Sequence, residues 1–415
     1  MAGPEPGVLL LGSDFKALGV ARSLGRRGIR VAVVDNLPRS AWFSRYVTRR
    51  FRWRESMCSE AMPSFLLNIA GSAGMEGCVL WPVQDDALEL VARNRELLSS
   101  AYRLITPHWD VLRQAHDKRL LHDAADEMGV AHPRTWYPTD EGSLDELNVT
   151  FPAIVKPTVS VDMQHAIGRK ALPVRDMDEL ITSYRVAAAI MPADHIMVQE
   201  IIPAESQSSV GAFAEGGRIV SAMTARRTRQ YPIDYGLSSS FVEAIDVPGL
   251  MDPAQQIVGR LGISGVVEVE FIRDARDGRQ LLLDVNPRPW GWHTLCIACG
   301  LDFPHIQYER SLGRHVVFGQ PRYGPRWIRL LTDVPAGIQG VRAGFFSPGA
   351  YVRSLFGGEL VGSVCDLSDP VPAAGDLAVA VMRLVKAAPP SRRRRSPAQP
   401  AAPAARGTSR PPPGC

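Results

Sequence analysis

Long apolar runs and closely spaced cysteines are scarce in this sequence. No uninterrupted apolar run approaches the ~18 residues of a membrane-spanning helix, and the first residues, "MAGPEPGVLLLG", lack the basic flank of a secretory signal. Six cysteines in 415 residues are too few for a disulfide framework, and Cys296-x-x-Cys299 has no second pair with which to form a zinc site. These absences predict a cytoplasmic protein without a membrane span.

Acidic residues are absent from residues 387–415, which contain six arginines among mainly proline and alanine. Because the whole chain has a net charge of +4, the rest of it is close to neutral, at about −2. A segment so poor in large apolar residues cannot offset the entropy cost of ordering, so we predict that it is a disordered basic tail. The body adds no pattern of basic and aromatic residues, which argues against a specific nucleic-acid partner.

The N-terminal residues alternate between strand and helix patterns. The segments "GVLLLG" (7–12) and "RVAVVD" (30–35) are continuous apolar runs typical of buried parallel strands, and a helical pattern separates them. A third run, "GCVLWPV" (77–83), precedes another helical pattern. The chain is long enough for two or three domains, so we predict a doubly wound parallel α/β domain over residues 1–110.

A dinucleotide site is the alternative function for this βαβ unit. Gly12 follows the first strand and Asp35 ends the second, which is the order found in dinucleotide-binding proteins. However, Asp14 stands in the turn where a glycine would let the backbone approach a pyrophosphate, and its carboxylate would repel that anion. We therefore favour a scaffold over an NAD or FAD site, and a dinucleotide-dependent oxidoreductase is the less favoured alternative.

Two lysines follow in positions that suit an anion. Lys118 begins a helical pattern that Asp117 can cap and Gly129 can end, and alone it would fit a solvated charge equally well. Lys156 ends the apolar strand "FPAIVKP", where a lysine is costly to bury unless it meets a negative group. Together they indicate an anion site.

The middle of the chain predicts an antiparallel sheet. The strand "IMVQEII" is broken at Pro203, and two further strands are joined at Gly216-Gly217. In "TARRTRQYP", strand alternation would put Arg227 and Arg229 on one face, as a clamp for phosphate or carboxylate oxygens. A solvated edge strand blunted by charges fits the same residues.

The segment "GVVEVEFIRDARDGRQLLLDVNPR" predicts a hairpin with strands at 265–272 and 280–286. A two-residue turn at Asp277-Gly278 would place the carboxylates of Glu270 and Asp284 on opposite faces of the sheet. A longer loop with a bulge would instead pair Glu270 with about Asp284, on the same face as Asn286. Such hard oxygen ligands could hold Mg²⁺ with water and phosphate, whereas the alternative is a polar strand end paired with Arg288.

Taken in order, these motifs resemble those of the ATP-grasp enzymes. Over residues 7 to about 315, the chain is similar to the carboxylate–amine ligase group, which includes D-aspartate ligase-like proteins. The motifs that carry the resemblance are the "DK" helix, "IVKP", "VQEII", "RRTRQYP", "VEVEF" and "LLLDVNPR". The resemblance implies a mixed α/β and α+β chain, in which the N-terminal domain precedes a two-lobed ATP-grasp fold with antiparallel sheets at 111–315. The small lobe would span about 135–200 and the large lobe about 200–315, followed by a C-terminal appendage at 316–386.

The resemblance also implies the ligands and the residues that bind them. The cofactors would be ATP and Mg²⁺, for which Mn²⁺ could substitute. Lys118 and Lys156 would contact the phosphates, and Gln199 would also belong to the ATP site. The backbone of Glu200 and Ile202 would bind the adenine edge at the hinge between the two lobes, and Glu205 or Gln207 would bind the ribose. Glu270, Asp284 and Asn286 would bind the metal, and Arg288 would stabilise the reacting phosphoryl or acyl-phosphate group. The sequence departs from the family pattern at Asp284, where glutamate is usual, and in the loop after Lys156, whose only glycine is Gly168.

The implied activity is that of an ADP-forming ligase. The enzyme would phosphorylate a carboxylate and let an amine attack the acyl phosphate, and this chemistry depends on cationic groups and Mg²⁺ more than on a nucleophilic side chain. A non-catalytic ATP-binding protein of the same fold is the alternative. The sequence does not indicate which small acid and amine would react, and it leaves a homodimer open.

Overall fold

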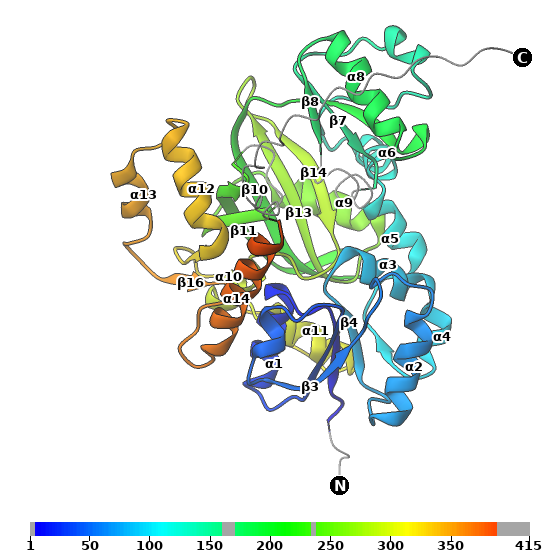
Figure 1. The fold of residues 1–415 in the computed structure, drawn as a ribbon, viewed down its shortest axis with the longest axis vertical. Helices are drawn as coiled ribbons and strands as arrows, with labels where there is room; N and C mark the ends of the chain where they lie inside the picture. The colour runs from blue at the N-terminus through cyan, green and yellow to red at the C-terminus, as the bar shows by residue number, and fades with distance from the viewer. Residues whose placement is uncertain (1–4, 160–170, 234–237, 388–415) are drawn as a thin grey trace, which may run out of the picture.

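A computed structural model describes residues 5–159, 171–233 and 238–387 of the chain (Figure 1). Three β-sheets organise these residues, and helices cover each sheet. None of the described helices is both long and apolar enough to cross a membrane. The basic tail at 388–415 and the glycine-poor loop at 160–170 lie outside the described residues.

The first sheet is the parallel sheet predicted for the N-terminal domain, with the strand order β3-β2-β1-β4-β5. Its strands are β1 (Val8–Leu11), β2 (Val31–Asp35), β3 (Val47–Arg52), β4 (Val79–Pro82) and β5 (Arg103–Leu104). The helices of this region are α1 (Phe15–Gly25), α2 (Met62–Ser72), α3 (Asp85–Arg93) and α4 (Arg95–Ser99), with the short 3-10 helix η1 (Ser40–Phe43). Leu10 packs in the α1 cluster and Leu9 in the α2 cluster, so both faces of the sheet are covered.

The second sheet is small and antiparallel, with the order β6-β9-β7-β8. It contains β6 (Thr135–Trp136), β7 (Ala153–Pro157), β8 (Leu172–Val174) and β9 (Ile196–Glu200), with α8 (Met177–Ala188), η2 (Gly142–Glu146) and η3 (Ala193–His195). Helices α5 (Trp109–His116) and α6 (Lys118–Met128) lead into it. The Asp117 carboxylate accepts a hydrogen bond from the Arg119 amide, and Gly129 ends α6 in a left-handed conformation with φ of 68°, as the sequence predicted.

The third sheet is the largest, with the order β14-β13-β10-β11-β12-β15-β16. Its strands are β10 (Ala204–Glu215), β11 (Arg218–Tyr231), β12 (Ser238–Ala244), β13 (Gly265–Asp274), β14 (Gln280–Asn286), β15 (Arg326–Ile328) and β16 (Leu360–Gly362). Helix α9 (Met251–Leu261) packs on one face, and α10 (His293–Ala298) and α11 (Phe303–Ser311) lie on the other. The second face shares its apolar cluster with helix α1, so the large sheet and the N-terminal domain have a common core.

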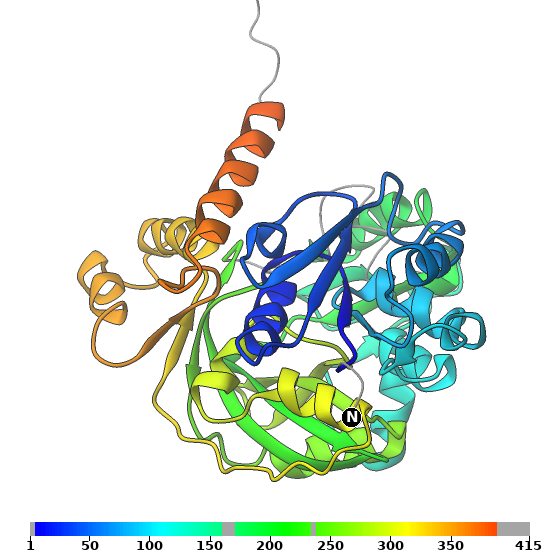
Figure 2. The same ribbon diagram turned by 90° about the horizontal axis from the view of Figure 1, so that it is seen from below.

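The C-terminal segment is only partly an appendage. Strands β15 and β16 extend the large sheet, whereas α12 (Leu330–Arg342) and α13 (Pro348–Ser354) form a helical hairpin beside β11. Helix α14 (Val371–Ala387) projects from the body of the molecule in Figure 2. In a buried ion pair, Arg22 of α1 donates to the Asp369 carboxylate at 3.0 Å, which connects this segment to the N-terminal domain. The domain limits given above stay predictions.

Candidate active site

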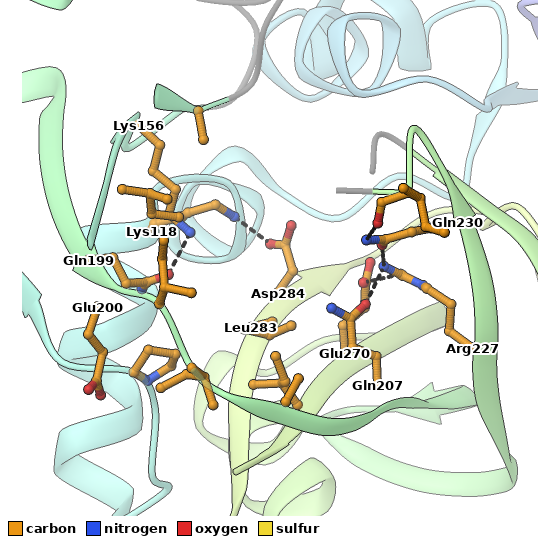
Figure 3. A pocket seen from close by; sticks show the side chains of 18 of the residues that line it. Lys118, Lys156, Gln199, Glu200, Gln207, Arg227, Gln230, Glu270, Leu283 and Asp284 are labelled. Atoms are coloured by element: carbon orange, nitrogen blue, oxygen red, sulfur yellow. Dashed lines mark hydrogen bonds and ion pairs between the residues drawn. The ribbon is translucent and has the colours of Figure 1, made fainter. Parts of the chain in front are cut away.

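A cavity of about 630 Å³ lies where the small sheet and the large sheet meet (Figure 3). Residues 201–203 connect β9 of the small sheet to β10 of the large one, so the cavity lies at the predicted hinge between the two lobes, and we call it the hinge cavity. Apolar side chains from both sheets line it beside lysines, carboxylates and amides. Its volume is in the range of small-molecule sites. Its apolar lining comes from Pro133, Ile154, Pro157, Ala171, Ile201, Ile202, Ala204, Ile233, Ile272, Leu283 and Phe345.

Both predicted lysines reach this cavity from different elements. The Lys118 amide donates to the Thr158 carbonyl at 3.0 Å, which brings the start of α6 beside the end of β7. The Lys118 ammonium lies 3.0 Å from the Asp284 carboxylate, and the Lys156 ammonium donates to the Gln199 side chain at 2.8 Å (Figure 3). Lysines, carboxylate and amide therefore converge on one space, where the cations could turn to a phosphate.

A buried histidine lies behind the lysines. The Nδ1 atom of His122 is 2.7 Å from the Tyr137 hydroxyl, and its ring stacks on His132 with the centroids 4.2 Å apart. Burial, and then the charges of His132, Lys156 and Lys118, lower the pKa of His122 to about 2. The imidazole is thus neutral at physiological pH.

The β13–β14 hairpin has the register that the metal prediction required. Glu270 pairs with Asp284 and Glu268 pairs with Asn286, and the register shifts between Glu270 and Phe271. The shift leaves Leu283 as an extra residue, which is the predicted bulge. Glu270 and Asp284 both line the cavity from adjacent strands, so the prediction that they share a face is confirmed.

The polar groups of the hairpin form a connected network. The Asn286 amide donates to Glu270 at 3.0 Å and to Glu268 at 3.3 Å, and the Trp292 indole donates to Glu268 at 2.7 Å. Burial and the neighbouring Glu270 carboxylate raise the pKa of Glu268 above its ordinary value. The second carboxylate oxygen of Glu270 accepts from Arg227 at 2.5 Å.

The donor set fits a hard cation that keeps most of its ligands as water or phosphate oxygens. Among the described residues, no group of three or more His, Cys, Asp or Glu side chains is arranged to hold a metal by itself. Two carboxylates and one amide oxygen on the adjacent strands β13 and β14 are nevertheless a suitable partial set for Mg²⁺, which is usually held by one or two carboxylates plus substrate phosphates. In this structure the two carboxylates are instead neutralised by Lys118 and Arg227.

The two arginines of β11 do not form the predicted clamp. Arg227 lines the cavity and donates to Gln207 at 2.9 Å as well as to Glu270. Arg229 is instead buried against the α12–α13 hairpin, where it donates to both oxygens of Asp333 at 2.8 and 2.9 Å. Register shifts on both sides of Arg229 interrupt the alternation of the strand, and this is why the two side chains part.

Of the residues predicted to bind the adenosine part of ATP, all but Glu205 line the hinge cavity. Gln199, Glu200 and Ile202 line it, although the Glu200 carboxylate is engaged by the Arg134 amide at 2.9 Å and by Arg276 at 3.2 Å. The sequence left the ribose contact open between Glu205 and Gln207. Gln207 lines the cavity, whereas Glu205 is more than half exposed and pairs with Arg273.

A second cavity, of about 550 Å³, opens between the large sheet and the N-terminal domain. It shares four residues with the first cavity: Lys118, Arg227, Glu270 and Asp284. The remaining polar lining is mainly charged and comes from both domains, and it includes Asp14, Lys16, Arg39, Asp85, Asp86, His116, Glu268, Asn286 and Arg288. The two cavities thus meet beside the β13–β14 hairpin.

Arg288 lies in the second cavity and is bound by a residue of the N-terminal domain. Its guanidinium donates to Asp85 of α3 through Nε and Nη2, the latter at 2.7 Å, and Nη2 also donates to Asn286 at 3.1 Å. Burial alone would raise the pKa of Asp85, but the charge of Arg288 outweighs it and holds that pKa well below its usual range.

The βαβ unit is closed to a pyrophosphate. The Asp14 side chain accepts hydrogen bonds from the Lys16 and Ala17 amides, so it occupies the helix start that a dinucleotide phosphate would use. The buried Asp35 carboxylate accepts from the Ser13 amide and hydroxyl and from the Leu37 amide. The Asp14 and Asp35 carboxylates are therefore both engaged in holding the loop after β1.

Several N-terminal residues of the second cavity were missed by the sequence reasoning. Lys16 follows β1, Arg39 follows β2, and Asp85 and Asp86 follow β4. The strand order reverses between β1 and β4, and ligands of open α/β sheets bind outside the carboxyl ends of the strands at such a point. That rule, applied to the predicted βαβ order, is the signal that could have found them.

Comparisons with known proteins agree with this geometry. Residues 193–328 match the family described as "ATP-grasp in the biosynthetic pathway with Ter operon". The arginine-specific large chain of carbamoyl phosphate synthase from Bacillus subtilis (strain 168) is 18% identical over 282 residues, which cover 66% of this chain. The same match covers 26% of that relative, so the chain spans about a quarter of the relative's length.

Solved structures share the fold at low sequence identity. An L-amino acid ligase from Bacillus licheniformis is 15% identical, with a TM-score of 0.58 and 75% of each chain covered. The biotin carboxylase domain of the Hydrogenobacter thermophilus 2-oxoglutarate carboxylase, solved with MgADP, ADP and bicarbonate, is 16% identical, with a TM-score of 0.61. That likeness covers 77% of this chain and 73% of the other. The family match over residues 193–328 and the likeness to these structures together show that the chain has an ATP-grasp fold.

Proposed function

We propose that this protein is an ATP-dependent ligase that joins a carboxylate to an amine through an acyl phosphate and releases ADP and phosphate. The observation that carries the proposal is the meeting of the two cavities at Lys118, Arg227, Glu270 and Asp284. A nucleotide in the hinge cavity would have its terminal phosphate beside these four shared residues. The acid and the amine would bind in the second cavity. Contact between the two reactants is what a phosphoryl transfer needs.

The lining of the hinge cavity supports nucleotide binding. Apolar side chains from both sheets suit an adenine, Gln207 suits a ribose hydroxyl, and Lys118 and Lys156 suit the phosphates. We assign the adenine edge to the backbone of Glu200 and Ile202, because the Glu200 carboxylate already has protein partners. The related biotin carboxylase domain was solved with MgADP, which makes the same cofactors reasonable here.

Glu270, Asp284 and Asn286 would hold Mg²⁺ in this proposal. When bound, the ion would neutralise charge on the terminal phosphates of ATP. For these oxygens to become ligands, Lys118 and Arg227 must exchange the carboxylates for phosphate or substrate oxygens. In such an exchange each side-chain cation keeps an anionic partner, because a phosphate or substrate oxygen replaces the carboxylate.

The proposed reaction has two steps. A carboxylate oxygen attacks the γ-phosphorus, the bond to the β–γ bridging oxygen breaks, and ADP leaves. The amine nitrogen then attacks the acyl carbon, phosphate leaves with the electrons of the carbon–oxygen bond, and the amine loses a proton to solvent. Arg227 and Arg288 would stabilise the charge that develops on the transferred group, since both line the second cavity beside the hairpin. We also propose a cytoplasmic location, because the reaction draws on ATP.

Nucleotide binding and product analysis test this function. ATP with Mg²⁺ should raise the melting temperature of the protein, and NAD should not. With a screen of small acids and amines, ADP release should depend on the acid, and hydroxylamine in place of the amine should yield a hydroxamate. Release of AMP and pyrophosphate would contradict the mechanism. Binding of MgATP without turnover for any pair of acid and amine would favour the non-catalytic alternative.

A further inference from the structure

The ion pair between Asp85 and Arg288 joins two domains inside the second cavity. Asp85 is in the first turn of α3, and Arg288 follows β14, so the pair connects residues 203 positions apart in the chain. We propose that Asp85 is a positioning residue, which fixes the Arg288 guanidinium for the transfer step from across the domain boundary. This inference rests on the function proposed above, and it makes the docking of the N-terminal domain part of the reaction site.

The hydrogen bonds of Arg288 specify its orientation. A guanidinium has five N–H donors in a rigid plane. Asp85 accepts from two of them, one on Nε and one on Nη2, while Asn286 accepts from the other Nη2 donor. The Pro289 carbonyl accepts from Nη1 at 3.3 Å, so among the described residues one Nη1 donor is left for a ligand. The Nε–Nη2 edge is thereby held, and the Nη1 corner is the part that can meet a reacting oxygen.

The surroundings distinguish this pair from an ordinary surface ion pair. The side chain of Arg288 is only 13% exposed and that of Asp85 is 38% exposed, and both line the cavity. On the same helix, Arg93 and Glu89 form a pair one turn apart, with side chains 52% and 31% exposed, and neither lines the cavity. The second pair provides a matched control, because its loss should leave the cavity unchanged.

A fixed arginine suits the transfer step for a general reason. A donor that is already aimed at the position of developing charge requires no rearrangement when the reaction occurs. Asn286 links the same guanidinium to the hairpin, because its amide group also donates to Glu270. Asp85 would therefore align Arg288 with the proposed metal residues, although Asp85 itself need not touch the transferred group.

Chemical reactivity tests the positioning without relying on turnover. In full-length protein, phenylglyoxal modification of Arg288, followed by peptide mass spectrometry, should be several-fold faster in Asp85→Asn than in the wild type. Glu89→Ala should leave that rate unchanged. Asp85→Asn keeps the shape of the side chain, so it should fold even if Asp85→Ala does not. Equal modification rates in the wild type and in Asp85→Asn would overturn the proposal whether or not an activity has been found.

Turnover gives the second arm of the experiment. ADP release from MgATP, with a mixture of amino acids and hydroxylamine as the probe, should fall about tenfold or more in Asp85→Asn, whereas the affinity for MgADP should stay within about twofold. Asp85→Ala added to Arg288→Ala should cause no further loss, and Asp85→Glu should recover part of the rate. Additive losses in the double variant would mean direct contact with substrate and would refute positioning. Absence of ADP release from the wild type would count against the proposed function alone.

Discussion

The two cavities differ in where their charges come from. In the hinge cavity, cations and anions belong to the two ATP-grasp sheets and α6, and the remaining lining consists of apolar side chains and three glutamines. In the second cavity, much of the charge comes from the N-terminal domain, and the Asp85–Arg288 pair crosses the boundary. In the proposed function, one fold would therefore supply the nucleotide site by itself, whereas the site for the other reactants would need a second domain.

The largest expected effect concerns Arg229, which lies in neither cavity although Arg227 on the same strand lies in both. Loss of its partner should therefore affect stability and leave both cavities intact. Its partner Asp333 is fully buried and also accepts from Ser240 and Tyr351. Asp333→Ala would leave a buried guanidinium without its carboxylate, so we expect a loss of about 3–5 kcal/mol in the free energy of unfolding, measured by urea denaturation.

The control for that prediction is an exposed pair. Glu127→Ala removes the partner of Arg260 on the protein surface and should leave the denaturation midpoint nearly unchanged. Asp333→Ala protein that remains folded should bind MgADP normally. A loss of nucleotide affinity larger than the loss of stability would show that the α12–α13 hairpin belongs to the site after all.

Arg288→Ala tests the second cavity. If the guanidinium acts on charge that develops during transfer, turnover should fall by about 10²-fold, or roughly 2.7 kcal/mol, and the affinity for MgATP should change little. Steady-state ADP release and calorimetric titration with a nonhydrolysable ATP analogue measure the two quantities. An equal fall in both would place Arg288 in the nucleotide site and would break the division between the cavities.

Lys156→Ala tests the hinge cavity, where we expect nucleotide affinity to fall, in contrast to Arg288→Ala. A lysine that contacts phosphate in both the ground state and the transition state provides uniform binding, so affinity and kcat/KM should fall together. We expect a change of about tenfold, on the order of 1.5 kcal/mol for a charged hydrogen bond. Lys16→Ala is a useful counterpart, because Lys16 lines only the second cavity and should affect the acid or amine more than the nucleotide.

The sequence predicted the parts of the site that depend on local pattern. Strand alternation, together with the requirement that Glu270 and Asp284 bind one ion, predicted that both lie on one face of the sheet. The bulge at Leu283 produces that arrangement. Alternation failed at Arg229, because the register shifts around it depend on how β11 and β12 pair, which no local pattern reveals. The roles of these residues in binding and catalysis stay predictions.

The contribution of the N-terminal domain could not be derived from local pattern either. Asp85 and Arg288 are far apart in the sequence, and their pairing depends on how α3 and β14 are brought together around α5. An Asp85-Asp86 pair at the start of a helix has a local explanation, since acids stabilise a helix N-terminus. Only the tertiary arrangement shows that Asp85 also faces an arginine.

The smallest expected effect is a pH dependence from His122, whose pKa is lowered by burial and in part by the two lysines of the hinge cavity. His122 has a pKa of about 2 in the folded protein, and an unfolded histidine has a value near 6.5. The unfolded state therefore binds a proton that the folded state excludes, so the contribution of His122 to stability is complete above about pH 6.5 and decreases as the pH falls toward 2. Between pH 7 and pH 6 this linkage should cost about 0.7 kcal/mol.

Urea denaturation of the wild type and of His122→Gln at both pH values measures this term. Other groups titrate in the same range, so the informative quantity is the difference between the two proteins in the change of unfolding free energy with pH. His108→Gln is the control, because His108 is exposed and lies outside both cavities. An identical pH dependence in the wild type and His122→Gln would mean that His122 can accept a proton behind the lysines. The region beside Lys118 and Lys156 would then accept a further positive charge despite its burial. The contrast in charge between the two cavities would be weaker for that reason.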